Sequence, residues 1–178
     1  MGPRGTTVRV QTFLPYADFV ASAEALDPKR LGKQRVEALQ VVRALTWENY
    51  GWRHHPVVTM WRGHEEALGR YGLCIVDAWT ALGFADTCAD TIEADLATAG
   101  VHAIRSQAEL AVAGALPPWL GNDAFHRSHR SALVRKDPVY YRALFPDVPD
   151  DLEYVWPGRA ASADDEDVEG RLRGHGRA

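Results

Sequence analysis

Residues 26–40, LDPKRLGKQRVEALQ, decide how this 178-residue chain folds. Asp27 is a good N-cap, and Pro28 suits the first helical position because its missing N–H would find no partner there anyway. Apolar residues then recur at helical spacing, which predicts a helix that runs from residue 28 to about residue 47 with one face buried. The apolar positions of that face are Leu31, Ala38, Leu39, Val42 and Leu45.

One edge of this helix combines two cations with a carboxylate. At about 100° per residue, Arg30, Lys33 and Glu37 fall together beside the apolar face. A carboxylate held between cations keeps a low pKa and stabilises a developing positive charge, and the cations can hold phosphates. We therefore expect these three side chains to line one open groove. The alternative is a solvated helix edge with an ordinary Lys33–Glu37 pair at i,i+4.

The rest of the chain predicts an all-α fold, a single compact helical domain over residues 10–157. Residues 10–14 form a short apolar segment, and a core helix is expected over residues 65–82. Other helices are expected near residues 18–25, 86–100, 106–114, 122–136 and 137–145, and a short helical stretch is expected to start near Val57. Residues 1–9 are expected to be a flexible leader, and residues 158–178 a disordered acidic tail that carries few apolar groups.

The charge is distributed unevenly along the chain. The net charge is −4, but residues 146–178 hold nine acidic residues against four arginines, and residues 1–145 hold 15 acidic against 16 basic. Two basic clusters stand out in this near-neutral body, and together they predict one phosphate-binding surface. The clusters are Lys29, Arg30, Lys33 and Arg35, and Arg127, Arg130, Arg135 and Lys136.

Composition indicates a cytoplasmic protein. Two cysteines, Cys74 and Cys88, do not make a disulfide framework and fit a reduced cytosol. No apolar run is long enough to span a membrane, and the first residues lack the apolar core of a secretory signal.

Three motifs in order resemble a known family. They are LDPKRLGKQRVEALQ, then ALGFADT at residues 81–87, then HRSHRSALVRKDPVYYRALF at residues 126–145. Together they resemble the pyrimidine-dimer DNA glycosylase family, the phage endonuclease V-like enzymes. QTFLPY at residues 11–16 and DLEYVWP at residues 151–157 make the chain most similar to an actinobacterial branch of that family. The resemblance covers roughly residues 10–157 and implies a compact helical protein that flips a base out of damaged duplex DNA.

The resemblance also implies a chemistry, in which an amine forms a Schiff base with the sugar and β-elimination then nicks the strand. The essential family glutamate falls on Glu37, which would stabilise the cationic sugar and move protons. The family nucleophile is the α-amine that follows the initiator Met, here Gly2, far from Glu37 in sequence. The alternatives are that the true start lies further in, that Lys29 or Lys33 supplies the amine, or that the bond is hydrolysed without a Schiff base.

The predicted DNA contacts come from both basic clusters and from the aromatic motif near the C-terminus. Arg30 falls where the phage enzyme has a histidine near its site, and Tyr140 and Tyr141 fall where it has an aromatic patch. The full set is Lys29, Arg30, Arg35, Arg127, His129, Arg130, Arg135, Lys136, Tyr140 and Tyr141.

No metal or other cofactor is expected, because the His126–His129 pair lacks a third ligand in a matching motif. The expected partner is duplex DNA with a damaged base, bound by a monomer and away from membranes. Two other functions stay open. One is a non-catalytic nucleic-acid-binding module with the same basic edge, and the other is an enzyme that acts on free nucleotides or nucleosides.

Overall fold

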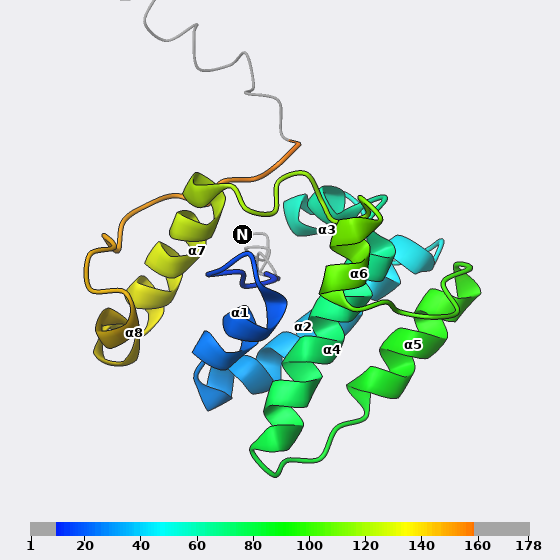
Figure 1. The fold of residues 1–178 in the computed structure, drawn as a ribbon, viewed down its shortest axis with the longest axis horizontal. Coiled ribbons are helices and arrows are strands. Elements are labelled where there is room, and N and C mark those ends of the chain that lie inside the picture. The colour runs from blue at the N-terminus through cyan, green and yellow to red at the C-terminus, as the bar shows by residue number, and fades with distance from the viewer. Residues whose placement is uncertain (1–9, 159–178) are drawn as a thin grey trace, which may run out of the picture.

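The computed structural model describes residues 10–158, and within that range the chain forms eight α-helices and no β-strand (Figure 1). The helices are α1 (Phe19–Ala25), α2 (Pro28–Thr46), α3 (Pro56–Trp61), α4 (Glu65–Ala81), α5 (Cys88–Thr98), α6 (Gln107–Val112), α7 (Asp123–Lys136) and α8 (Pro138–Leu144). The all-α prediction is therefore confirmed for the described residues. Gly2, the expected leader and the expected acidic tail from residue 159 lie outside them.

Helix α2 begins as its sequence predicts. The Asp27 carboxylate accepts a hydrogen bond of 3.1 Å from the backbone N–H of Arg30, and Pro28 occupies the first turn. The predicted apolar face is buried from Leu31 to Val42. Leu45 is only half-buried, since it lies one residue before the end of the helix.

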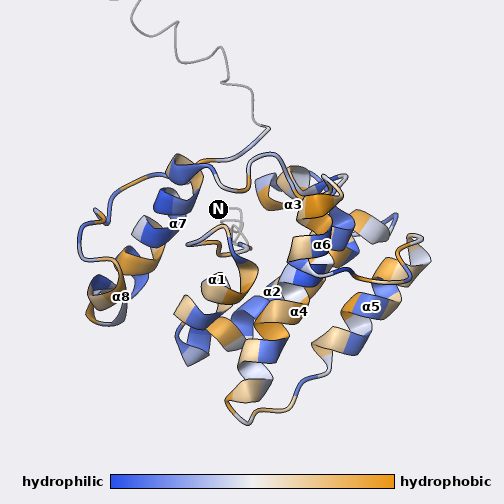
Figure 2. Ribbon diagram, viewed as in Figure 1, coloured by the Kyte–Doolittle hydropathy of each residue, from blue (hydrophilic) through white to orange (hydrophobic). Residues whose placement is uncertain are grey.

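The core lies between α1, α2, α4 and α5. Helix α4 contacts α1 and α5, and α2 packs against both α4 and α5. Trp61, Tyr71 and Phe19 are among the largest fully buried side chains and contact one another through their rings. Figure 2 shows hydrophobic and hydrophilic residues alternating around these helices, as expected when one face of each is buried. Within residues 10–158, no helix has both the length and the hydropathy needed to cross a bilayer.

Helices α7 and α8 form a second group on the other side of the molecule, and the segment from residue 10 passes between the two groups (Figure 1). Residues 146–158 then return along α7. The backbone N–H groups of Leu152 and Val155 donate to the hydroxyls of Ser131 and Ser128, at 3.0 and 3.2 Å. This returning segment covers α7 with backbone that the serines hold in place.

Residues 10–15 are buried without belonging to any helix, so side chains must satisfy their backbone groups. Gln34 on α2 does this twice, because its amide donates to the Gln11 carbonyl at 2.7 Å and accepts from the Phe13 N–H at 2.9 Å. The Tyr71 hydroxyl donates to the Phe13 carbonyl at 2.7 Å. The path of this segment is therefore fixed by side chains from α2 and α4.

Two histidines on α7 hold the next residue, Leu14. The Leu14 N–H donates to Nδ1 of His129 at 3.0 Å, and Nδ1 of His126 lies 2.8 Å from the Leu14 carbonyl. Nε2 of His126 accepts from the Gly121 N–H at 2.9 Å, so its proton must be on Nδ1, where it donates to Leu14. The i,i+3 spacing of these histidines therefore serves a backbone clamp and leaves no pair of nitrogens facing a metal.

Candidate active site

Glu37 is the centre of the candidate site, and it is buried. Its side chain is 8% exposed, and Oε1 lies 3.4 Å from Nζ of Lys33, whose side chain is 71% exposed. The backbone N–H of Gln11 also donates to the Glu37 carboxylate, and Lys136 at the end of α7 approaches it. Segments that are far apart in sequence thus meet at one carboxylate.

The sequence-based expectation for the pKa of Glu37 is wrong. Burial raises the pKa of this carboxyl above its ordinary value, and the attraction of Lys33 and Lys136 and the Gln11 hydrogen bond only partly offset the effect. The expectation considered only the neighbouring cations, whereas the segment from residue 10 covers Glu37 and buries its carboxyl group. A carboxyl group with a raised pKa exchanges protons closer to neutral pH, which suits general acid–base work.

The position of Gln11 follows from local contacts. Gln34 lies one turn before Glu37 on α2 and binds the Gln11 carbonyl, while the Thr12 N–H turns back to the Gln11 side chain at 2.9 Å. Phe13 follows, with Nζ of Lys136 5.9 Å from the centre of its ring. The backbone nitrogen of Gln11 therefore faces Glu37 because α2 holds both.

Arg30 does not join the Glu37 site. Its guanidinium lies 2.7 Å from the Asp27 carboxylate, 3.9 Å from Asp137 and over the ring of Tyr141. The expectation that Arg30, Lys33 and Glu37 line one groove is thus wrong for Arg30. Helical angle alone did not reveal that the cap residue and the start of α8 compete for the guanidinium.

Four further predicted DNA contacts have partners within the protein, and three of them are buried or partly buried. His129 is fully buried, and burial lowers the pKa of its ring to about 3, so it is neutral. Tyr141 is fully buried, its hydroxyl donates to Asp27 at 2.5 Å, and burial raises its pKa. Arg35 lies 2.6 Å from Asp86. Arg135 donates to the Asp150 and Leu152 carbonyls at 2.7 and 3.4 Å. Burial leaves the side chains of His129 and Tyr141 out of reach of DNA, and Arg35 is engaged by Asp86. Arg135 is exposed, so its DNA contact stays a prediction.

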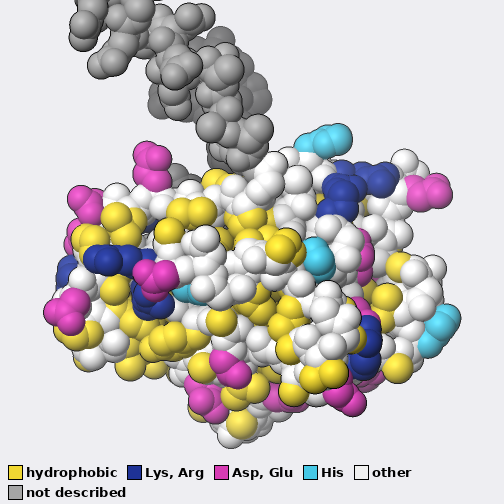
Figure 3. Space-filling view, turned by 45° about the horizontal axis from the view of Figure 1, so that its top comes forward, with side chains coloured by type: hydrophobic (Ala, Val, Ile, Leu, Met, Phe, Trp, Pro, Cys, Tyr) yellow, Lys and Arg dark blue, Asp and Glu magenta, His cyan; other side chains and the backbone are white. Residues whose placement is uncertain are grey.

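The Arg130 guanidinium also has partners within the protein, since it donates to the Pro15 carbonyl at 2.9 Å and lies 3.4 Å from the Asp123 carboxylate. The exposed predicted contacts are Lys29, Arg127, Arg135, Lys136 and Tyr140, and Lys33 of the candidate catalytic set is exposed beside them. On the face shown in Figure 3, Lys and Arg side chains occur in separate groups with Asp and Glu beside them. The expected single phosphate-binding surface is therefore reduced to a few exposed cations on α2 and α7.

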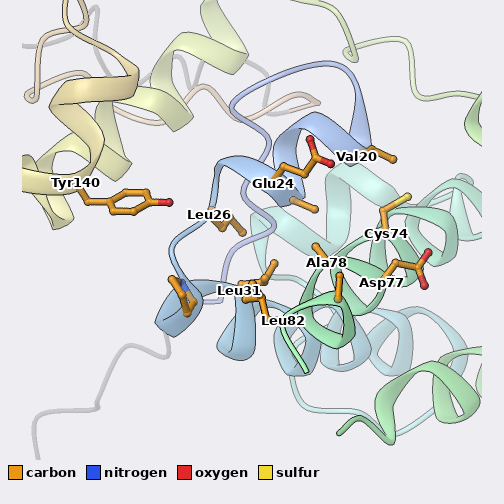
Figure 4. Close-up of a pocket in the computed structure, with 12 residues that line it drawn as sticks. Val20, Glu24, Leu26, Leu31, Cys74, Asp77, Ala78, Leu82 and Tyr140 are labelled. Carbon is orange, nitrogen blue, oxygen red and sulfur yellow. The ribbon is translucent and has the colours of Figure 1, made fainter. Parts of the chain in front are cut away.

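A cavity of about 460 Å³ opens on a different flank of α2 (Figure 4). Its lining is mainly apolar and comes from α1, the start of α2, the second half of α4 and Tyr140 of α8. Glu24 and Asp77 stand at its rim as exposed carboxylates. Because carboxylates repel phosphates, this cavity is a poor seat for DNA. Within residues 10–158, no group of three or more His, Cys, Asp or Glu is arranged to hold a metal ion.

Comparison with known proteins gives one match. A family model described as pyrimidine dimer DNA glycosylase matches residues 10–92, which include the segment at Gln11, the whole of α2 and Glu37. The match ends before α7, so it does not cover His126 and His129, which bind the Leu14 backbone and which we call the histidine clamp. No curated protein and no solved structure matches the chain significantly.

Proposed function

We propose that this chain, which belongs through residues 10–92 to the pyrimidine dimer DNA glycosylase family, cleaves the glycosidic bond of a damaged pyrimidine in duplex DNA with Glu37 as its central carboxylate. The family implies DNA glycosylase activity on pyrimidine dimers, and the residue roles below are specific to this chain. The observation that carries the proposal is the meeting of the buried Glu37 carboxylate with Lys33 and with the Gln11 nitrogen.

Glu37 is suited to a reaction in which positive charge develops on a sugar. When the bond between C1′ and the base breaks, its electron pair leaves with the base, and the deoxyribose becomes electron-poor at C1′. A carboxylate in a water-poor site stabilises that charge more than one in bulk water does. Exposed Lys136 and Lys29 lie on or near the same side and would hold the phosphates that flank the flipped nucleotide.

Two nitrogen atoms lie close to the Glu37 carboxylate, the backbone nitrogen of Gln11 and Nζ of Lys33. The Gln11 nitrogen faces Glu37 but is an amide within the chain, and an amide does not attack C1′. Among residues 10–158, Lys33 supplies a primary amine 3.4 Å from the carboxylate. We therefore assign the amine to Lys33 in the full chain. In this scheme neutral Lys33 attacks C1′, and the base leaves with the electron pair of its bond and gains a proton. The C1′–O4′ bond of the sugar ring then breaks as the imine forms, so that O4′ takes up a proton and Glu37 accepts the proton that the amine sheds.

Borohydride trapping tests this assignment. Purified protein is mixed with a duplex that carries one cyclobutane pyrimidine dimer, and with a second duplex that carries an abasic site. With the duplex in saturating excess, we expect trapping in the wild type and its loss in Lys33→Gln. Lys29→Gln should bind DNA more weakly but should still be trapped under these conditions. Lys29 is the matched control because it is an exposed lysine one turn earlier on the same helix.

A second pair of variants tests the alternative nucleophile, an α-amine at residue 11. A chain whose first residue is Gln11 places an α-amine where the amide now faces Glu37. Trapping by that chain after Lys33→Gln, together with trapping by full-length Lys33→Gln, would reject Lys33 as the source. Glu37→Gln distinguishes an enzyme from a non-catalytic binder, since the substitution should abolish cleavage by an enzyme and leave a binder's affinity unchanged or tighter.

A further inference from the structure

The loop between α4 and α5 presents an aromatic pair that the Glu37 chemistry does not use. Phe84 is 47% exposed, although it is a large hydrophobic residue. One face of its ring stacks on Trp79, with ring centres 4.3 Å apart and planes 21° apart. The other face is directed away from this contact. We call Trp79 and Phe84 together the aromatic shelf.

A hydrogen bond and close packing on α2 hold the Trp79 ring of the aromatic shelf in place. Nε1 of Trp79 donates to the Ala85 carbonyl at 2.9 Å, and this hydrogen bond holds the backbone of the loop against the Trp79 ring. The indole also lies directly on α2, because a Cβ added at Gly32 would come within 2.8 Å of it. Glycine is therefore the residue that lets Trp79 approach α2 so closely.

Arg35 fixes the far side of the loop. Its guanidinium lies 4.9 Å from the Trp79 ring centre and 2.6 Å from Asp86, whose other carboxylate oxygen accepts from the Ala89 N–H at the start of α5. These contacts place Arg35 inside the structure and also neutralise Asp86. The one carboxylate of this loop is thus paired, and it adds little repulsion toward a phosphate.

The shelf borders the same exposed strip of α2 as Glu37. At about 100° per residue, Gly32, Val36, Lys29, Lys33 and Glu37 follow one another around about 140° of the helix. Val36 is 40% exposed and both lysines are exposed. The strip therefore has the aromatic shelf along one border, two cations along its middle and the candidate catalytic carboxylate along the other. A helix with its side chains is about 10 Å wide, so one nucleic acid can contact both borders.

We propose that the Trp79–Phe84 shelf is a stacking site for a base of the DNA bound at Glu37. An exposed, rigid aromatic face beside cations fits a nucleobase attached to phosphates, because every base offers a π-face for stacking. An apolar side chain inserted beside a base step also helps to unstack it, which a base-flipping enzyme needs. This inference rests on the proposed function, and it assigns the shelf a role that is separate from bond cleavage.

Binding measurements on Phe84→Ala and Phe84→Leu test it. Duplexes carry one pyrimidine dimer and a 2-aminopurine at successive positions around it, because stacking on an aromatic ring quenches the fluorescence of this base. Phe84→Ala should weaken binding about tenfold and relieve the quenching at one position. Phe84→Leu should also relieve it, although leucine keeps apolar bulk.

Two controls separate stacking from charge and from general damage. Val112→Ala changes another exposed hydrophobic residue, on α6, and should leave affinity unchanged. Lys29→Gln should lower the slope of log affinity against log salt by about one, whereas Phe84→Ala should leave the slope as it is.

The inference fails if Phe84→Ala binds with wild-type affinity and wild-type quenching at every position, or if the wild type binds none of the duplexes. The proposed function fails by a different measurement, namely wild-type binding without cleavage or trapping. In that case a Phe84-dependent affinity still supports the shelf.

Discussion

The buried segment at residues 10–15 meets ionisable side chains at both of its ends, and the two ends behave differently. At Leu14, His126 and His129 are neutral, and Nδ1 of each ring pairs with the Leu14 backbone, while Nε2 of His129 is buried without a hydrogen-bond partner in residues 10–158. At Gln11, Glu37 is a buried carboxyl group whose pKa is raised because its charged form is poorly solvated. The first end stabilises the fold, and the second weakens it at neutral pH. This contrast between neutral rings that hold the backbone and a poorly solvated carboxyl group is typical of a scaffold and the site that it supports.

Glu37→Gln should produce the largest effect and should sharpen the contrast. Loss of a general acid–base group typically costs about 10²- to 10⁴-fold in rate, so cleavage of a dimer-containing duplex should fall by that factor. Stability should change in the opposite direction. The folded pKa of Glu37 lies above its unfolded value, so its contribution is most favourable at low pH and is lost as pH rises through the folded pKa.

Urea denaturation at pH 4 and pH 8 measures this second effect. Glu37→Gln should raise the free energy of unfolding at pH 8 and change it little at pH 4. A variant that is less stable than the wild type at pH 8 would contradict the interpretation of Glu37 as a strained group.

His129→Leu should test the other end of the segment. The substitution leaves the buried Leu14 N–H without its acceptor, and an unsatisfied buried donor costs about 1–3 kcal/mol in unfolding free energy. Urea denaturation at pH 8, where the wild-type ring is neutral, measures the loss. Equal stability of wild type and variant would show that the clamp contributes nothing, and the contrast between the two ends would disappear.

The dependence of stability on pH should distinguish the two ends directly. Because burial lowers the pKa of His129 to about 3, its stabilising contribution is complete above its unfolded pKa and is lost as pH falls toward the folded value. Burial also lowers the pKa of His126, because the charged ring is poorly solvated there. Each histidine contributes a slope of up to about 1.4 kcal/mol per pH unit below about pH 6.5.

Glu37 titrates with the opposite sign, so the measurement is best made in Glu37→Gln protein. Unfolding free energy should then fall from pH 6.5 to pH 4.5, and adding His129→Leu should flatten the curve. An unchanged slope in the double variant would assign the acid sensitivity to other groups.

Tyr71→Phe should have the smallest effect, at the middle of the segment. It removes the hydroxyl that donates to the Phe13 carbonyl, and one hydrogen bond contributes about 1 kcal/mol. Melting temperature and dimer cleavage are both measured. Cleavage should stay close to wild type, because Gln34 still holds Gln11; a large loss would mean that the segment is aligned from its middle.

Local sequence signals predicted the helices well. Asp27 and Pro28 mark the start of α2, and three- and four-residue spacing identified α4, because caps and periodicity act within a few turns. The partners of charged and polar residues were not accessible in this way. Nothing near Arg35 in sequence points to Asp86, and nothing near His129 points to Leu14, 115 residues away. Lys136 was predicted as a phosphate contact, and only the packing of α7 against residues 10–15 brings it toward Glu37.

The histidine clamp also has a consequence for the order in which the protein is made. Residues 10–15 leave the ribosome well before the two histidines that bind Leu14, which lie 112 and 115 residues later. A nascent chain that ends at residue 92 already contains Glu37, Lys33 and Gln11, yet it lacks the helix that grips Leu14. Contacts between such distant residues form late, because the intervening chain must first be closed into a loop. The part of the protein with the candidate chemistry is thus synthesised early, whereas the contacts at Leu14 and the approach of Lys136 to Glu37 are added only when α7 has emerged.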